Sequence, residues 1–291
     1  MRSESLIIQT CKRATLIVAL FFMMGARSAG SGETYQDIIE KAYNLSLQKD
    51  RTQAVSILLG ALKKESKKST AQKELTNALN QVANVFYSDK AQQLYELGLS
   101  LKASDPGLAA SRLQEASRLE PENMSIELAL IRLALSNNDC ATAAAKLQKQ
   151  KDLVLAIEDL RLVAAQTAIC QGKFNDYLSY KNATDLKASG LSSFWQAAEL
   201  EYLYRTSAFV KTQEAALSLQ KTDPNFPEPH YWEWKADVEM KVKGDKAAQR
   251  YLTLCKTLNS RQQRQYLPEP LLCRRTTEVE TFLKKNNNSE I

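Results

Sequence analysis

Small and large apolar residues recur at fixed helical spacings, and this pattern constrains the fold more than any other feature. A small residue is followed by a large one four positions later and by a second small residue three positions after that. Residues at these spacings lie on one face of a helix, where small side chains let a partner helix approach closely. The pattern occurs as Ala54, Leu58 and Ala61, as Ala109, Leu113 and Ala116, and as Ala248, Leu252 and Cys255.

The composition agrees with a helical chain. Only 9 glycines and 7 prolines occur among 291 residues, and the frequent residues Ala, Leu, Lys, Gln and Glu lose little side-chain freedom in a helix. Long period-two runs of β-branched residues are absent, so the sequence predicts an all-α fold. We expect helices over residues 35–48, 51–65, 71–87, 91–103, 107–119, 124–136, 140–150, 153–170, 173–187, 192–205, 207–221, 228–242 and 245–258.

These helices resemble those of tetratricopeptide repeat proteins. Ala109 and Leu113 recur 34 residues later as Ala143 and Leu147, and 34 residues is the length of that repeat. Pro121 lies where this family ends its repeat. The resemblance implies a right-handed superhelical solenoid of antiparallel helix pairs, about seven pairs, with each pair touching only its neighbours.

The N-terminal segment resembles a secretory signal peptide. Lys12 and Arg13 precede an apolar run over residues 16–24, which small residues follow. This run is shorter than the roughly 20 apolar residues that span a bilayer, so a permanent anchor is the less favoured alternative. We expect residues 1–30 to be removed and the mature protein to be periplasmic or secreted, without stable membrane insertion.

The expected domain organisation follows from these features. Residues 31–258 form the repeat solenoid, residues 259–285 a C-terminal cap and residues 286–291 a disordered, Asn-rich tail. Residues 182–193, rich in polar residues, form either a hinge or an ordinary loop. Without residues 1–30 the net charge falls from +6 to +3, so nucleic-acid binding is not expected.

Four of the five cysteines lie beyond the signal segment. An exported protein keeps disulfides, and four cysteines allow three connectivities. The repeat resemblance favours Cys140 with Cys170, and Cys255 with Cys273, the second pair clipping the C-terminal segment. Four buried free thiols are the alternative.

The residues that catalysis or cofactor binding needs are scarce. The chain has one histidine, His230, and lacks both a Gly-rich phosphate loop and a Gly-x-Ser-x-Gly motif. We therefore expect no catalytic residue, no metal site and no cofactor, and a protein that is not an enzyme.

Candidate partner-binding residues gather late in the chain. Trp232 and Trp234 are two positions apart and cannot share one helical face, so we expect at least one exposed indole that anchors a partner. Packing in a core and a solvated basic face are the alternatives. The candidates are Trp195, Tyr231, Trp232, Trp234, Arg261, Arg264, Arg274 and Arg275.

The resemblance implies a scaffold or adaptor that holds a partner protein or peptide in its concave groove. Such a protein would belong to a cell-envelope complex of secretion, motility or outer-membrane assembly. The alternative is an accessory protein of peptidoglycan or polysaccharide metabolism that binds or acts on glycan, because exported helical solenoids also resemble the superhelical parts of lytic transglycosylases.

Overall fold

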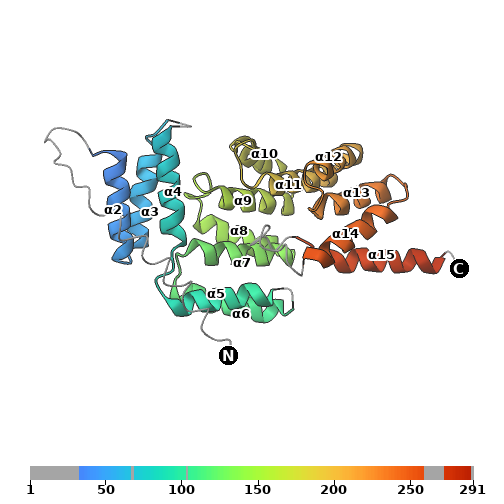
Figure 1. Ribbon diagram of the computed structural model, residues 1–291, viewed down its shortest axis with the longest axis horizontal. Coiled ribbons are helices and arrows are strands. Elements are labelled where there is room, and N and C mark those ends of the chain that lie inside the picture. Colours follow the sequence, from blue (N-terminus) through green and yellow to red (C-terminus); the bar gives the residue numbers. More distant parts are fainter. Residues whose placement is uncertain (1–32, 67–68, 103, 259–271, 290–291) are drawn as a thin grey trace, which may run out of the picture.

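The computed structural model describes residues 33–66, 69–102, 104–258 and 272–289, which form fourteen helices and no strand (Figure 1). The predicted all-α class is therefore confirmed for this part of the chain. The expected signal segment, Arg261 and Arg264 lie outside the described residues. The helices are α2 (Tyr35–Leu47), α3 (Arg51–Leu62), α4 (Thr70–Asn84), α5 (Asp89–Leu101), α6 (Pro106–Leu119), α7 (Met124–Ser136), α8 (Cys140–Lys149), α9 (Glu158–Cys170), α10 (Phe174–Asn182), α11 (Ser192–Arg205), α12 (Phe209–Thr222), α13 (Glu228–Glu239), α14 (Asp245–Leu258) and α15 (Thr276–Ser289).

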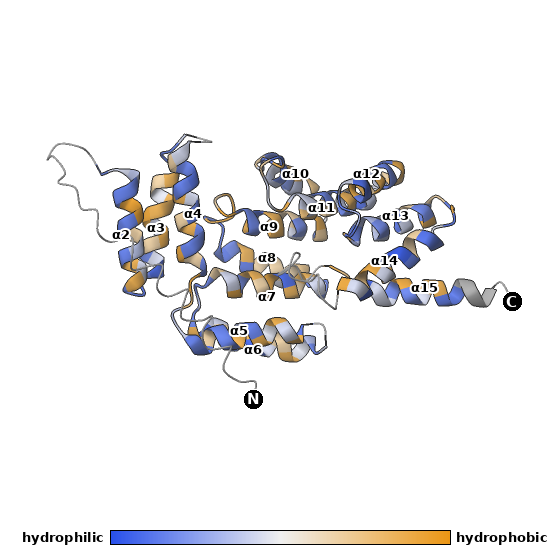
Figure 2. Ribbon diagram, viewed as in Figure 1, coloured by the Kyte–Doolittle hydropathy of each residue, from blue (hydrophilic) through white to orange (hydrophobic). Residues whose placement is uncertain are grey.

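Helices α2, α3 and α4 pack against one another at one end of the molecule (Figure 1). Thr34 and Asp37 form a capping box that starts α2, and Ser69 caps α4. Helix α3 is apolar along most of its length (Figure 2), and it packs between α2 and α4, which cover it from two sides. Ala54 and Leu58 of the repeated pattern are fully buried there.

Helices α5 and α6 form a closely packed pair. A Cβ atom on Gly98 would lie 2.7 Å from Leu113 Cγ, closer than real Cβ contacts allow. Asp105 caps α6, and Pro106 takes the first helical position, where its missing N–H costs nothing. The pair therefore depends on a small residue at position 98.

From α7 onward the helices pack in a regular order. Helix α7 contacts α8 and α9, α9 contacts α10 and α11, α11 contacts α12 and α13, and α13 contacts α14. The odd-numbered helices thus touch both the next odd-numbered helix and their own even-numbered partner. Helices α7 and α9 are buried on most sides as a result.

The same left-handed turn ends the first helix of several pairs. Asn138, Gly172, Ser207 and Lys241 have φ values of 57–72° and follow α7, α9, α11 and α13, and Lys49 follows α2 in the same way. In each turn the next amide donates to the carbonyl five residues back, at 2.8–3.0 Å. From Asn138 onward these turns are 34, 35 and 34 residues apart.

The structure corrects two expected boundaries. Helix α9 begins at Glu158, not at residue 153, since residues 151–156 form turns and Ile157 is extended. Helix α10 ends at Asn182, not at residue 187. Helix α15 lies in the segment that we expected to form a C-terminal cap and runs to Ser289. Val279 is fully buried and Phe282 packs on Trp234, and this packing supports a helix that the asparagines then continue.

The four cysteines pair as the repeat resemblance favours. Cys140 at the start of α8 bonds Cys170 at the end of α9, and Cys255 in α14 bonds Cys273 just before α15. Their Cα atoms are 5.8 and 5.6 Å apart, within the usual range. Two disulfides are typical of a protein that folds outside the reducing cytosol.

Candidate functional site

The aromatic residues predicted as surface anchors are buried. Trp195, Tyr231, Trp232 and Trp234 are each between 1 and 4% exposed. Trp232 packs against Tyr204 of α11, whereas Trp234 packs against α15. The expectation of an exposed indole is therefore wrong: α13 has neighbours on opposite sides, so both faces of the helix are covered.

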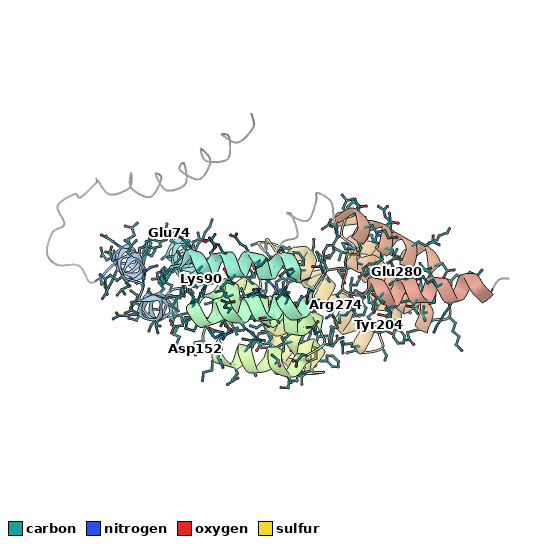
Figure 3. All side chains as sticks on the ribbon, turned by 90° about the horizontal axis from the view of Figure 1, so that it is seen from below. Glu74, Lys90, Asp152, Tyr204, Arg274 and Glu280 are labelled. Atoms are coloured by element: carbon teal, nitrogen blue, oxygen red, sulfur yellow. A yellow bond between two sulfur atoms is a disulfide. The ribbon has the colours of Figure 1, made fainter. Side chains whose placement is uncertain are left out.

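Two of the predicted surface arginines also turn inward. The side chains of Arg274 and Arg275 are only 12 and 14% exposed. Each lies 3.3 Å from Glu201 Oε2 of α11. Figure 3 labels Arg274 where the central helices meet the C-terminal ones. These two residues therefore do not contribute to the basic surface that we expected.

The arginines enter a cleft that contains two carboxylates, the buried Glu228 and the partly buried Glu201. Glu201 Oε2 accepts from Arg274 and Arg275, while its Oε1 accepts from Arg205 one turn later on α11. Glu228, the first residue of α13, accepts from the Cys273 amide at 3.0 Å and lies 3.9 Å from Arg275 Nη1. Both carboxylates thus bind groups of the segment that leads into α15.

Aromatic rings complete the contact with Arg275. Its guanidinium carbon lies 4.5 Å from the centre of the Tyr231 ring and 4.4 Å from that of Trp232. A planar guanidinium stacks favourably on such rings. The Arg275 amide donates to the Tyr251 hydroxyl at 3.3 Å. The site thus combines charge, stacking and backbone contacts around one side chain.

The charges of the cleft depend on one another. Burial alone would raise the pKa of Glu201, but Arg275 and Arg274 outweigh it, and the pKa lies below the ordinary value. Burial raises the pKa of Glu228 above its ordinary value although Arg275 opposes the shift. Burial lowers the pKa of Arg275, but Glu201 and its other neighbours reverse this and raise it overall. Glu201 and Arg275 therefore face each other as ions.

The cleft is bordered by the first helix of four successive pairs. Arg274 Nη1 donates to the Leu135 carbonyl at the end of α7, at 2.7 Å. Gln166 of α9 lines the cleft together with residues of α11 and α13. A cavity of about 30 Å³ is left beside the two arginines. We call this surface of α7, α9, α11 and α13, which contacts residues 272–275, the arginine cleft.

A larger and open groove lies elsewhere, between α8, α9 and α10. Its volume is about 400 Å³, and Leu147, Val154, Leu155, Tyr180 and Lys151 are among the residues that line it. Leu155 is 64% exposed. None of the residues predicted as binding sites lies in this groove.

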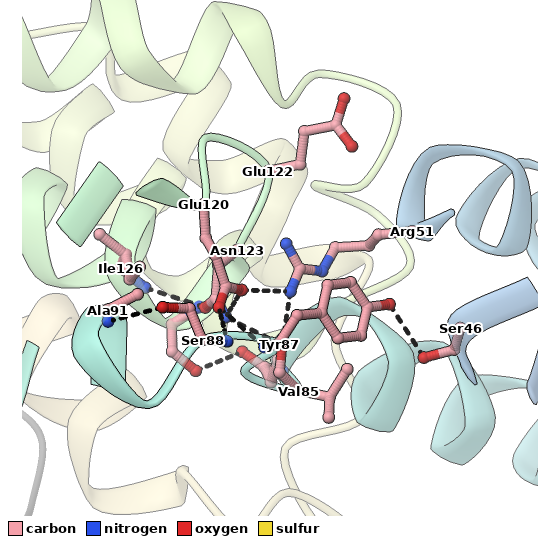
Figure 4. A network of polar contacts seen from close by, with 12 residues as sticks. Ser46, Arg51, Val85, Tyr87, Ser88, Ala91, Glu120, Glu122, Asn123 and Ile126 are labelled. Atoms are coloured by element: carbon pink, nitrogen blue, oxygen red, sulfur yellow. Dashed lines mark hydrogen bonds and ion pairs between the residues drawn. The ribbon is translucent and has the colours of Figure 1, made fainter. Parts of the chain in front are cut away.

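A second buried charge network joins the N-terminal helices to the rest (Figure 4). Arg51 of α3 and Glu120 after α6 are each 5% exposed, and their side chains meet at 2.7 Å. The amides of Tyr87 and Ser88, before α5, donate to Glu120 at 2.7 and 2.8 Å. Burial raises the pKa of Glu120, but hydrogen bonds from Arg51, Asn123 and these amides outweigh it, so the pKa lies below its ordinary value.

The described residues contain no group of three or more His, Cys, Asp or Glu side chains that could hold a metal ion. Helices that are both long and apolar enough to cross a membrane are also missing from these ranges. His230 is buried at the start of α13, with Nδ1 3.8 Å from Glu233.

No family model, curated protein or solved structure matches the chain.

The sequence did not single out the carboxylates of the arginine cleft. Glu201 stands four residues before Arg205, a spacing typical of an exposed ion pair on a helix surface. Glu228 begins α13, where an acidic residue is favoured by the helix dipole. Both residues therefore have an ordinary local explanation, and only packing brings them together.

Proposed function

We propose that the chain is an exported helical-repeat scaffold that holds a segment of a partner polypeptide along the first helices of successive pairs. One observation carries this proposal: residues 272–275, outside any helix, occupy a cleft bordered by α7, α9, α11 and α13. A surface that binds one chain segment through carboxylates and aromatic rings has the chemistry to bind another.

The regular turns support a repeat solenoid over α7–α14. Left-handed turns 34, 35 and 34 residues apart end the first helices of four successive pairs. This period agrees with that of tetratricopeptide repeats. Each first helix also contacts the next first helix, as stacking of repeats requires. The resemblance to this family is thus strongest over residues 124–258, whereas α2, α3 and α4 pack as three helices.

The compartment is part of the proposal. The two disulfides and the signal-like residues 1–30 support a periplasmic or secreted protein. The partner would then be an envelope protein or peptide. The glycan alternative would use either the late aromatics for binding or carboxylates for catalysis, and the three tryptophans that binding would need are buried.

Site-specific photo-cross-linking in cells tests the scaffold function. A photoreactive phenylalanine analogue replaces Ala197, which lines the cleft, or Glu40, which is exposed on α2. We expect one discrete protein adduct from position 197 and none from position 40. Purified partner must then bind the purified protein. The proposal fails if position 197 yields no discrete adduct or the same adducts as position 40.

A sedimentation control addresses the glycan alternative. The purified protein is mixed with isolated peptidoglycan and centrifuged. A scaffold for polypeptides stays in the supernatant, whereas sedimentation with the glycan supports the alternative.

A further inference from the structure

We infer that the arginine cleft recognises a polypeptide segment with two adjacent arginines, and that residues 272–275 fill it as a competing internal ligand. This inference rests on the scaffold function proposed above and names the chemistry of the partner. It also assigns a regulatory role to the C-terminal segment.

The cleft is specific for guanidinium groups. Glu201 Oε2 receives an N–H from each of two arginines, and Arg275 is held at the same time by two aromatic rings. A lysine ammonium lacks the planar fork that can meet a carboxylate and stack on a ring together. The Leu135 carbonyl at the end of α7 takes a further N–H from Arg274. Separate parts of the cleft thus bind the two adjacent arginines.

The backbone of the C-terminal segment is held by its contacts. Cys273 has a φ of 58°, a region that residues with a Cβ atom rarely adopt. The other residues with positive φ all lie in inter-helix turns, whereas Cys273 lies between the last repeat and α15. Its conformation is fixed by the bond to Cys255 and by the amide contact with Glu228. A competitor that takes the contacts with Glu201 and Glu228 removes the non-covalent part of what holds the segment, while the bond to Cys255 keeps it close to the cleft.

A partner can gain a contact that the internal segment does not make. Gln166 Oε1 lines the same cavity and has no hydrogen-bond partner among the described residues. The adjoining volume of about 30 Å³ exceeds what one additional small donor group or water needs. The internal segment has the compensating advantage of its tether, which raises its effective concentration. Whether a partner displaces the internal segment therefore depends on two opposing effects. The partner gains a contact with Gln166, whereas the covalent connection of the internal segment raises its effective concentration.

Binding of a labelled peptide tests this inference. The probe is a fluorescent peptide with the sequence of residues 272–277 and serine in place of Cys273, titrated with the exported protein and followed by fluorescence anisotropy. We expect the Arg274→Ala/Arg275→Ala variant, whose cleft is vacated, to bind at least tenfold more tightly than the wild type. Addition of Glu201→Gln should reverse this gain. A peptide with lysine at both arginine positions should bind at least tenfold more weakly.

A second variant covers the case in which the vacated protein does not fold. Cys255→Ser/Cys273→Ser keeps both arginines and the chain connection to α14 but removes the disulfide that clamps the segment to this helix. It should bind the peptide more tightly than the wild type. Circular dichroism and thermal unfolding establish that each variant is folded. The inference is overturned if the folded variants bind no better than the wild type. It is also overturned if neither variant folds, since the segment is then part of the core.

The two proposals fail separately. A discrete partner cross-linked at position 197, without any binding of the arginine peptide, contradicts the arginine inference and leaves the scaffold function supported. Absence of the position-197 adduct both in the wild type and in the Arg274→Ala/Arg275→Ala variant contradicts the scaffold function itself.

Discussion

The molecule has two arginine–glutamate networks, one buried and one partly buried, and they differ in where their arginines come from. At the N-terminal junction Arg51 belongs to α3 and meets Glu120 in the α6–α7 connection. In the arginine cleft, Arg274 and Arg275 belong to a short segment that precedes α15 and is bonded to α14 through Cys273. Both networks pair arginine with glutamate, but Arg51 belongs to a helix, whereas Arg274 and Arg275 precede α15.

Because of this difference, we interpret the N-terminal network as a structural contact between helices and the arginine cleft as a binding site that residues 272–275 occupy. Arg51 cannot leave Glu120 without parting α3 from the connections before α5 and after α6. Helices α7, α9 and α11 each contact the next of these first helices directly, so our inference treats residues 272–275 as a segment that can be displaced from α7, α9, α11 and α13 while its bond to Cys255 remains. The N-terminal network therefore fixes the orientation of two helical groups, and the C-terminal one fills a cleft.

The largest effect is expected at the N-terminal junction. Arg51→Ala leaves the Glu120 carboxylate buried without its charged partner and should lower the free energy of unfolding by about 3–5 kcal/mol. Urea denaturation measures this change. Arg112→Ala is the matched control, because its pair with Glu115 is more than one-third exposed and contributes about 0–1 kcal/mol. Equal effects of the two variants would contradict a structural role of Arg51.

The next effect compares the two disulfides. Cys255→Ser/Cys273→Ser opens a bridge between residues 18 positions apart, for which the chain-entropy model gives about 3 kcal/mol. We expect hydrogen exchange to increase in residues 272–289 only. Cys140→Ser/Cys170→Ser opens a bridge inside the repeats and should raise exchange in α8 and α9. Faster exchange throughout the repeats after loss of Cys255–Cys273 would contradict the comparison.

A smaller effect is expected where α5 packs on α6. Gly98→Ala places a Cβ atom 2.7 Å from Leu113 and should destabilise the protein by about 1–3 kcal/mol through overpacking. Gly60→Ala, on the open side of α3, should instead stabilise it by about 0.4–1 kcal/mol. Thermal unfolding of both variants gives the sign directly, and stabilisation by Gly98→Ala would refute the close contact.

The smallest effect is a difference in pH dependence between the junctions. The folded-state pKa of Glu120 is lowered, so its stabilisation is present above the ordinary value of 4.5 and is lost as the pH falls through the folded pKa. The pKa of Glu228 is raised, so its contribution decreases as the pH rises from 4.5 through the folded pKa. Glu120→Gln should flatten the acid loss of stability, whereas Glu228→Gln should increase stability at pH 7 relative to pH 4.5. Urea denaturation between pH 3 and 7 measures the free energy of unfolding of both variants. The assignment is contradicted if the two substitutions change the pH dependence of this free energy in the same direction.

Much of the fold was accessible from local sequence patterns. Ala54, Leu58, Ala109 and Leu113 were predicted to face partner helices, and all four are buried. Helical spacing carries this information because it places these residues on one face, whatever the rest of the chain does. The cysteine pairing also followed, since the repeat alignment places Cys140 near the end of the next first helix.

The arginine cleft was not accessible in this way. Arg274 and Arg275 were interpreted as surface residues because adjacent charges are usually solvated, and their carboxylates come from helices some 50–70 residues earlier in the chain. Helix α15 was missed for a related reason: its apolar residues are few, and Phe282 is explained only by its contact with Trp234. Long-range packing, not local pattern, determines both features.

Hydrogen exchange of the Arg274→Ala/Arg275→Ala variant tests most directly whether helices α11 and α13 stay folded without their contacts to the C-terminal segment. The account predicts that amides of α11 and α13 keep protection factors within about tenfold of the wild type, while residues 272–289 exchange faster. Loss of protection in α11 and α13 together with the segment would contradict it, because the arginines would then be part of the repeat core and not the occupant of a cleft.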